Sequence, residues 1–241
     1  MSGILSLLRA MANSSYSPEL LAVISYANSQ GYTLPSNAQL DNIDNNLIIP
    51  LKAAGLWTTH DVLYCLKNDG SSGFGGINLI DPSLNSFVPG GWANNVGGNS
   101  GLTGYTPDGS RNYQLNSASV ASISVLVTGV NTFQIRVNGN NMTSADNNGS
   151  IAMINSIGYV NLSNRTGTVW QHGNLSGTTL TYYSNTQSGT SSAGTAAYPP
   201  SQWIIGQTME ASSQIAIAGI GSSMNNATLK TIYENWFNNV P

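Results

Sequence analysis

The carboxylates are the first side chains to consider for chemistry. Hydrolysis of a glycosidic bond with retention needs two carboxylates about 5 Å apart, usually placed by nearby positions of one strand. The chain contains three glutamates, Glu19, Glu210 and Glu234. Glu19 falls at a predicted helix start, Glu234 falls in a predicted final helix, and Glu210 has no acid two or three positions away. The sequence therefore predicts no glycosidase pair.

The histidines and the single cysteine offer no other catalytic arrangement. A serine or cysteine nucleophile needs a base within hydrogen-bond reach, and neither His60 nor His172 has a motif neighbour of that kind. No G-x-S-x-G nucleophile motif occurs. Cys65 lies in the apolar run 62–66, where a small buried hydrophobe is predicted. We therefore expect that the protein is not an enzyme.

Two short segments are candidates for a metal site. Calcium takes six to eight oxygen ligands, often from closely spaced carboxylates. Residues 146–149 (D-N-N-G) and residues 68–70 (N-D-G) each contain one carboxylate. Because Asn, Asp and Gly tolerate left-handed backbone conformations, both segments are predicted to be turns. We predict no cofactor, with bound Ca²⁺ as the alternative at these segments.

Several aromatic residues could stack on sugar rings. The alternative for each of them is core packing, because aromatic side chains supply large buried areas. Histidine is among the non-glycine residues enriched at positive φ, so the run Q-H-G-N around His172 is predicted to be a hairpin turn. The candidate glycan contacts are Trp92, Trp170, His172, Tyr182 and Tyr183.

The surface is predicted to be nearly uncharged. Charged residues make up 7% of the chain and the net charge is −3, so a basic surface for nucleic acid is not expected. Hydrophobic residues make up 40%, which is unlike a disordered chain. No stretch approaches the roughly 20 apolar residues of a membrane helix, and no secretion signal is predicted. We expect a folded protein with a neutral, hydrogen-bonding surface and no membrane partner.

The N-terminal quarter of the chain has the pattern of helices. Ser17-Pro18-Glu19 combines a cap, a proline at the first helical position and an acid in the first turn. An apolar stripe follows at 20, 23, 24 and 27, and Gly31 is predicted to end the helix. A second helix is predicted from Ser36, with a kink or restart at residue 50 and an end at residue 55. The run 4–11 is predicted to add a further helical turn or two.

From residue 61 the pattern is that of β-strands. Short apolar runs are separated by Gly, Asn and Asp about every ten residues, which is typical of a β-sandwich or barrel. Turns are expected at 68–70 and 73–76, and short strands within 89–112. After Gly221, Asn225 or Asn226 is predicted to cap a final amphipathic helix. The predicted strands are 62–66, 77–80, 120–127, 132–137, 151–159, 168–171, 179–183, 203–205 and 215–220.

The closing segment, Q-I-A-I-A-G-I-G-S-S-M-N-N-A-T-L-K-T-I-Y (residues 214–233), resembles the end of a known fold. This is the laminin-G-like, or concanavalin-A-like, β-sandwich of tailed-phage virion proteins. Residues 47–66, L-I-I-P-L-K-A-A-G-L-W-T-T-H-D-V-L-Y-C-L, resemble the passage from a helix to the first strand of that family. Residues 77–82, 101–115 and 162–174 resemble a turn, a glycine-rich passage and an N-R-T hairpin of the family, in the same order. The likeness spans residues 47–233 and does not cover residues before about 34.

The resemblance implies a fold, a domain division and a function. The implied fold is mainly β: a laminin-G-like jelly-roll β-sandwich, preceded by a small N-terminal helical segment and closed by a C-terminal helix. Residues 1–57 would form an assembly or attachment segment, and residues 58–241 the sandwich. The implied function is that of a non-enzymatic virion structural protein, in a head decoration, head fibre or tail appendage.

The resemblance also implies partners. These would be other virion proteins and further copies of this chain, with a homotrimer by analogy with phage fibres. The chain would be made in the host cytoplasm and located in the virion. The alternative function is a carbohydrate-binding lectin or adhesin module that contacts a host-surface glycan.

The first predicted helix must bury its apolar stripe, because a short helix is marginal alone. We expect this stripe to pack against neighbouring copies or another virion protein rather than on its own sandwich. The reason is that the C-terminal helix is already expected to cover the sandwich.

Overall fold

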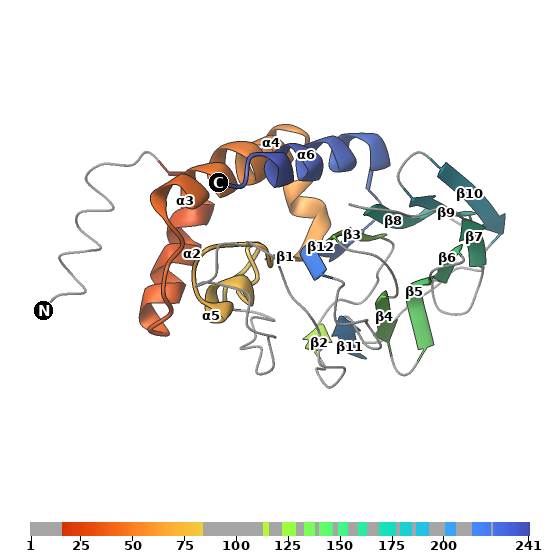
Figure 1. The fold of residues 1–241 in the computed structure, drawn as a ribbon, viewed down its shortest axis with the longest axis horizontal. Coiled ribbons are helices and arrows are strands. Elements are labelled where there is room, and N and C mark those ends of the chain that lie inside the picture. Colours follow the sequence, from red (N-terminus) through yellow and green to blue (C-terminus); the bar gives the residue numbers. More distant parts are fainter. Residues whose placement is uncertain are drawn as a thin grey trace, which may run out of the picture.

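The protein is built in three layers. The structure, a computed structural model, describes residues 16–83, 113–115, 122–128, 133–137, 140–146, 149–153, 159–162, 169–176, 179–184, 187–192, 201–205, 214–222 and 224–241. The C-terminal helix, α6 (Asn226–Asn238), lies over one six-stranded sheet, a second six-stranded sheet lies on the opposite face, and the N-terminal helices lie at one end (Figure 1). The fold is therefore a mainly β sandwich with a helical layer.

The first helices begin where the sequence places their caps. The helices are α2 (Pro18–Ser29), α3 (Asn37–Ile43), the π-helical η1 (Asp44–Ile48), α4 (Ile49–Ala53), the 3₁₀ turn η2 (Trp57–Thr59), α5 (Ser72–Gly75) and α6 (Asn226–Asn238). The side chains of Ser17, Ser36 and Asn225 each accept a hydrogen bond from a backbone N–H of the first turn, which confirms the predicted starts of α2, α3 and α6. Gly31 follows α2 with a φ of 70°, as the predicted end requires.

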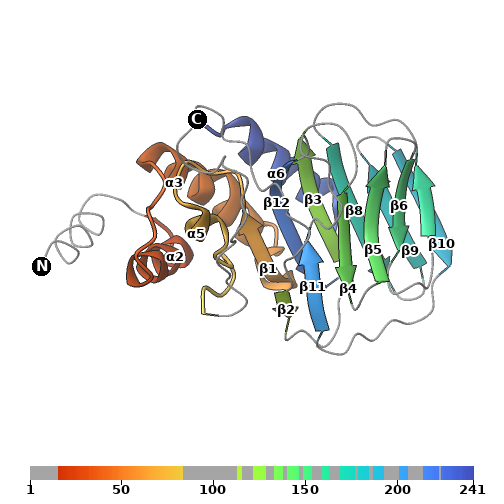
Figure 2. The same cartoon turned by 60° about the horizontal axis from the view of Figure 1, so that its bottom comes forward.

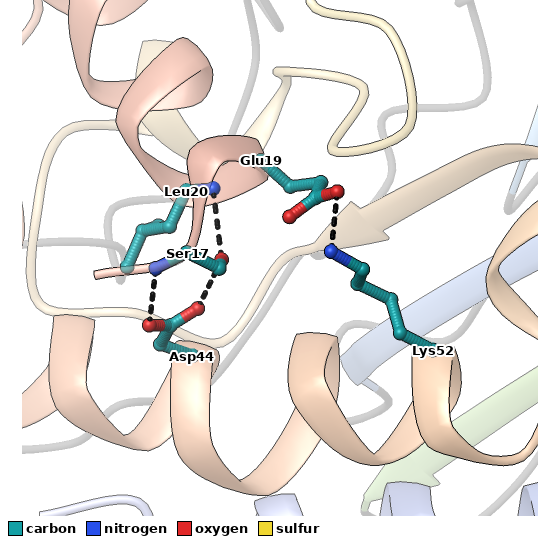
Figure 3. Close-up of polar contacts among 5 residues, drawn as sticks. All are labelled: Ser17, Glu19, Leu20, Asp44 and Lys52. Carbon is teal, nitrogen blue, oxygen red and sulfur yellow. Dashed lines mark hydrogen bonds and ion pairs between the residues drawn. The ribbon is translucent and has the colours of Figure 1, made fainter. Parts of the chain in front are cut away.

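Polar contacts tie the start of α2 to the helices that follow it. The backbone N–H of Ser17 donates to Asp44 Oδ2 at 2.8 Å, and the Ser17 hydroxyl donates to Asp44 Oδ1 (Figure 3). Lys52 Nζ in α4 lies 2.6 Å from Glu19 Oε1 in α2. The start of α2 is thus fixed against both η1 and α4.

The predicted kink or restart at Pro50 takes the form of a π-helical segment. The π-helical segment η1 ends at Ile48, two residues before Pro50, and the N–H of Ile49 bonds to the carbonyl of Asp44, five residues earlier. A proline ring clashes with the carbonyl four residues before it, and a wider π turn relieves that clash. The helical path therefore continues through Pro50 to Ala53 and ends before Gly55, which has a φ of 69°.

Twelve strands within the described residues form the two sheets. The strands are β1 (His60–Cys65), β2 (Tyr113–Leu115), β3 (Ser122–Thr128), β4 (Phe133–Val137), β5 (Asn140–Asp146), β6 (Gly149–Met153), β7 (Tyr159–Leu162), β8 (Val169–Ser176), β9 (Thr179–Ser184), β10 (Gln187–Ser192), β11 (Ser201–Ile205) and β12 (Gln214–Gly221). The first sheet has the order β1-β12-β3-β8-β9-β10, and the second has the order β2-β11-β4-β5-β6-β7. We call them sheet A and sheet B. All their pairings are antiparallel.

Most of the predicted strands coincide with observed ones, whereas β2, β5 and β10 have no counterpart among the predicted strands. The predicted strand 151–159 is replaced by β6 and β7, with residues 154–158 outside the described part. The predicted strand 77–80 is a bend, and the predicted turn 73–76 falls mostly within α5. The helical turns expected at 4–11 and the strands expected within 89–112 lie outside the described residues.

A side chain explains why residues 77–80 do not form a strand. Asn78 is buried beside the edge strand β1, where its Oδ1 accepts from Leu63 N at 3.1 Å and its Nδ2 donates to the Asp61 carbonyl at 3.2 Å. The Leu79 N–H then donates to the Leu63 carbonyl at 2.9 Å. Because these bonds satisfy the open edge of β1, the segment covers that edge without pairing as a strand.

The helices and sheet A share one hydrophobic core. The stripe of α2, formed by Leu20, Val23, Ile24 and Ala27, is buried in the same cluster as Ile217 of β12. The expectation that this stripe packs against another chain is therefore wrong. The reason is geometric: helices α2–α5 lie beside β1 at one end of the sheets (Figure 2), so the apolar stripe is covered by its own chain.

Helix α6 joins the helical layer to sheet A. It lies against η1 and α4 towards its end, and against β8 towards its start (Figure 1). Leu229, Ile232, Tyr233 and Trp236 are its buried residues, as the amphipathic pattern predicts. No helix among the described residues has the length and apolarity that crossing a bilayer requires.

Candidate functional site

The structure buries two of the five candidate glycan contacts. Trp170 and His172 lie in β8 with fully buried side chains. Tyr183 in β9 is half-buried, and Tyr182 lies in the same strand, with its side chain outside the described part. Trp92 lies outside the described residues. Trp170 and His172 therefore take the alternative of core packing and do not face solvent.

His172 does not occupy a hairpin turn. It pairs with Tyr183 of β9 and with Ser124 of β3 in the middle of sheet A. Sheet pairing, and not the local preference of histidine for positive φ, sets its conformation. Because Trp170 and His172 are two positions apart, both point to the face of sheet A that α6 covers.

A β-bulge brings the second histidine to the same face. His60 pairs with Gly221, and Val62 pairs with the adjacent Ile220, so Asp61 is an extra residue in β1. Successive strand residues face opposite sides, and one extra residue reverses the alternation. His60 therefore faces α6, as Leu63 does, whereas Val62 faces the opposite side of sheet A.

His60 connects the start of β1 to the middle of α6. Its Nδ1 lies 2.7 Å from the carbonyl oxygen of Leu56, and its Nε2 lies 3.0 Å from the hydroxyl of Tyr233. A carbonyl oxygen only accepts, so Nδ1 carries the proton and Nε2 accepts from Tyr233. The neutral ring is thus held in one tautomer by both neighbours.

His172 and Trp170 both bind the first residue of α6. Trp170 Nε1 donates to Asn226 Oδ1 at 2.9 Å, and His172 Nδ1 lies 3.0 Å from the same oxygen. An indole N–H only donates, so the atom shared by the two rings is the amide oxygen, and His172 Nδ1 carries a proton. We call His60, Trp170, His172, Asn226 and Tyr233 the histidine cluster.

Ring contacts complete the histidine cluster. Tyr233 meets Trp170 edge to face, with 5.4 Å between the ring centroids. His172 stacks on Tyr183 at 5.8 Å. These are favourable aromatic geometries, worth about 0.5–1.5 kcal/mol per pair beyond burial. The histidine cluster therefore forms the packing between the first half of α6 and sheet A.

A glycine allows the helix to come this close. A Cβ atom at Gly219 would lie 2.3 Å from the Tyr233 hydroxyl oxygen and 3.0 Å from the His60 ring. Gly219 pairs with Leu63 of β1 and Ser124 of β3, so it lies on the α6-facing side of sheet A. The absence of a side chain there makes room for the contact between Tyr233 and His60.

Both histidines are held neutral. Burial lowers the pKa of His60 to about 4, against a smaller opposing effect of its bond to Leu56. Burial also lowers the pKa of His172 to about 4, with the Asn226 bond raising the pKa and His60 lowering it further. At neutral pH each ring is a buried, uncharged structural group, whereas a general base needs contact with a substrate.

Several other described groups with catalytic potential also take part in structural contacts. Burial raises the pKa of the Cys65 thiol well above its usual value. Lys230 pairs with Glu234 at 2.8 Å along α6, and Glu19 pairs with Lys52 across two helices. Among the described residues, no group of three or more His, Cys, Asp or Glu is arranged to hold a metal ion.

The segment 68–70, one of the two calcium candidates, is a hydrogen-bonded turn. Asn68 Oδ1 accepts from Gly70 N at 2.9 Å, and Asn68 Nδ2 donates to the Cys65 carbonyl at 3.1 Å. Asp69 Oδ1 accepts from Ser36 N at 2.9 Å. In the other segment, Asp146 pairs with Gly149 between β5 and β6, and residues 147–148 lie outside the described part.

Sequence reasoning missed the residues that connect the histidines to α6. The sequence predicts Asn226 only as one of two possible helix caps, and it assigns Tyr233 no role beyond its place in the closing segment 214–233. Asn174 was not singled out, although its Oδ1 accepts from Met224 N at 2.9 Å before α6 begins. The sequence does hold one signal, the spacing along the strand. Trp170, His172 and Asn174 occupy every second position of β8, so they share one face of it.

Comparisons with known proteins give distant similarities. No family model matches the chain, and no curated protein is similar to it in sequence. Among solved structures, a Trypanosoma rangeli sialidase has a TM-score of 0.39 and 8% identity over 57% of this chain and 29% of its own. A Caenorhabditis elegans galectin has a TM-score of 0.33 and 9% identity over 48% of this chain and 93% of its own. Because both TM-scores are below 0.5, the fold is assigned from the two observed sheets and not from these similarities.

Proposed function

We propose that this chain is a non-enzymatic structural protein of a bacteriophage particle, built on a laminin-G-like sandwich. It would form a head decoration, a head fibre or a tail appendage. One observation supports the non-enzymatic part: within the described residues, both histidines, the cysteine and two of the glutamates take part in structural contacts. His60, His172 and Cys65 are buried, and Glu19 and Glu234 are each paired with a lysine.

The positions of the family-like segments support the proposal. The passage 47–66 supplies His60, the hairpin-like passage 162–174 supplies Trp170 and His172, and the closing segment 214–233 supplies Gly219, Asn226 and Tyr233. These three segments are far apart in the chain, and they meet at the histidine cluster. The sequence likeness to phage virion proteins thus coincides with one packing unit.

The proposal places assembly contacts on the outer surface. The α2 stripe is buried within its own chain, so it is not free to hold a neighbouring copy. The exposed residues of α6 are mostly uncharged, including Thr228, Thr231, Asn235 and Asn238. A neutral, hydrogen-bonding surface suits contacts with other virion proteins, or with two further copies in a trimer, over a wide range of salt.

Mass spectrometry of purified phage particles tests the proposed location. Particles banded in a density gradient should contain the chain in a fixed ratio to the major capsid protein. Extraction of the same particles with high salt should leave that ratio unchanged, because a neutral contact surface depends little on screening. Recovery of the chain only in the soluble lysate, with none in the banded particles, would rule out a virion component.

A carbohydrate-binding module is the second candidate. One observation favours it: Thr179, Ser188 and Thr190 are exposed on β9 and β10, beside the half-buried Thr181 and Tyr183. The register places all five on one face of sheet A. Hydroxyl groups beside an aromatic ring suit the polar and apolar faces of a sugar. Binding of the purified protein to a glycan array, with no chain in banded particles, would favour this candidate over the first.

A further inference from the structure

Helix α6 covers only part of its side of sheet A. Its first residue, Asn226, contacts β8, and β9 and β10 extend beyond the helix to the end of the sheet (Figure 1). On this part of the sheet Thr179, Ser188 and Thr190 are exposed. We propose that the outer face of β9 and β10 binds a neutral polysaccharide chain, which lies along the strands beside the ring of Tyr183. This inference rests on the second candidate function, glycan binding, and adds the site and the class of glycan.

The strand register places the residues of this site side by side. His172 of β8 pairs with Tyr183 of β9, which in turn pairs with Ser188 of β10. Thr181 of β9 pairs with Thr190 of β10 in the same way. Directly paired residues point to the same side of a sheet, and His172 points to the side that α6 covers. Residues 179, 181, 183, 188 and 190 therefore continue that side beyond α6, and we call them the open face.

The ring of Tyr183 is held in place by its neighbour. His172 stacks on it, with 5.8 Å between the ring centroids and 20° between the ring planes. The His172 ring is itself fixed, because it is fully buried and contacts Asn226 at the start of α6. The stacking takes the side of the Tyr183 ring that is turned to β8. The opposite side is turned to β10, where the paired residue, Ser188, is small and exposed.

A fixed aromatic ring among hydroxyl groups matches the two kinds of surface of a sugar unit. The C–H face of a sugar ring packs on an aromatic ring, and the sugar hydroxyls exchange hydrogen bonds with threonine and serine. An aromatic side chain that is already fixed loses little conformational entropy on binding. Tyr183 would supply the apolar contact, and Thr181, Ser188 and Thr190 would supply the polar ones.

The length of the open face suits a chain of sugars rather than a single sugar. Thr179, Thr181 and Tyr183 are alternate residues of β9, so they lie about 7 Å apart and span roughly 13 Å. This span is longer than one sugar ring. Ser188 and Thr190 add a second row on β10, about 4.8 Å away in the direction across the strands. Consecutive units of an extended chain can therefore contact the open face together.

The absence of charge around the open face selects a neutral glycan. Residues 166–209, which contain β8, β9 and β10, include no Asp, Glu, Lys or Arg. The first charged residue of α6 is Lys230, which pairs with Glu234. Proteins recognise carboxylate, sulfate and phosphate groups with Arg or Lys. The open face offers neither residue, so an uncharged chain fits it better than an anionic one.

Affinity electrophoresis of the full chain in native gels tests the site. Each gel contains one polysaccharide: dextran, mannan, galactomannan or β-glucan as neutral probes, and alginate or hyaluronan as anionic probes. We expect at least one neutral polysaccharide to retard the protein in proportion to its concentration, which gives a dissociation constant. Alginate and hyaluronan should leave the mobility unchanged.

Two uncharged substitutions locate the binding on the open face. Ser188→Gln fills the space beside the Tyr183 ring, and Tyr183→Leu removes the ring. Each should weaken binding roughly fivefold or more, and thermal melts followed by circular dichroism show whether each variant is folded. Ser25→Gln makes the same change at an exposed position of α2. It is the matched control and should keep the affinity within about twofold.

Three results would overturn the inference, and they separate it from the function on which it rests. Retardation by a neutral polysaccharide that Ser188→Gln and Tyr183→Leu leave unchanged would keep glycan binding and place it elsewhere. Retardation by alginate or hyaluronan alone would show that the ligand is charged. No retardation by any of the six polysaccharides would contradict both the inference and the second candidate function.

Discussion

Replacement of Ile217 by aspartate is expected to lower the free energy of unfolding by about 4 kcal/mol or more. Ile217 is fully buried in β12, between Cys65 of β1 and Leu126 of β3. A carboxylate at this position would either be buried as a charge without a partner or take up a proton, and both cost free energy. Urea unfolding followed by far-UV circular dichroism measures the loss.

The control for this prediction is a change of volume without charge. Ile217→Val removes one methylene group and should cost only about 0.5–1.5 kcal/mol. If Ile217→Asp were soluble and unfolded at the same urea concentration as the unmodified protein, β12 would not be a central strand, and the packing of α6 on sheet A would be wrong.

Replacement of Asn226 by leucine is expected to cost about 2–5 kcal/mol of unfolding free energy. The change removes the oxygen that accepts from both Trp170 Nε1 and His172 Nδ1. A buried donor left without an acceptor costs about 1–3 kcal/mol, and here two donors are affected. Equilibrium unfolding at pH 7.5, where both histidines are neutral, measures this cost without a contribution from protonation of the rings.

Asn235→Leu is the matched control, because it makes the same change on the same helix. Asn235 is exposed and binds Asn46 at the surface, so its replacement should cost no more than about 0.5–1 kcal/mol. Equal stability of the two variants would show that Asn226 does not hold β8 to α6.

Local signals in the sequence are sufficient for the starts of α2, α3 and α6. Ser17, Ser36 and Asn225 sit directly before apolar residues at helical spacing, and the structure confirms all three caps. The strand β12 was also predictable, because residues 215–220 form an apolar run bounded by turn residues. These features depend on residues close in the chain, where side-chain and backbone preferences act directly.

The histidine cluster was not predictable because it depends on contacts between distant residues. The bulge at Asp61 turns His60 towards α6, and a single-sequence pattern has no marker for such an extra residue. His172 was assigned to a turn from its local preference, and pairing with β3 and β9 overrides that preference. Asn78 was assigned to a strand, yet its side chain binds the edge of β1 in place of a neighbouring strand.

The prediction for the α2 stripe failed for a related reason. The sequence shows that the stripe must be buried, and it does not show by what. The expectation treated the C-terminal helix as a complete cover for the sandwich. In the structure α6 covers sheet A and also contacts η1 and α4, so α2 packs into the same core beside it.

Nuclear magnetic resonance of the two histidine rings tests the central claim most directly, namely that these groups serve the fold and not catalysis. With ¹⁵N-labelled protein, both rings should show the neutral form with the proton on Nδ1 from pH 8 down to pH 5.5. Their pKa values should lie near 4, because burial disfavours the charged form of each ring. If either ring titrated near pH 6.5, or carried its proton on Nε2 alone, that histidine would not be buried beneath α6, and the account of the site would be contradicted.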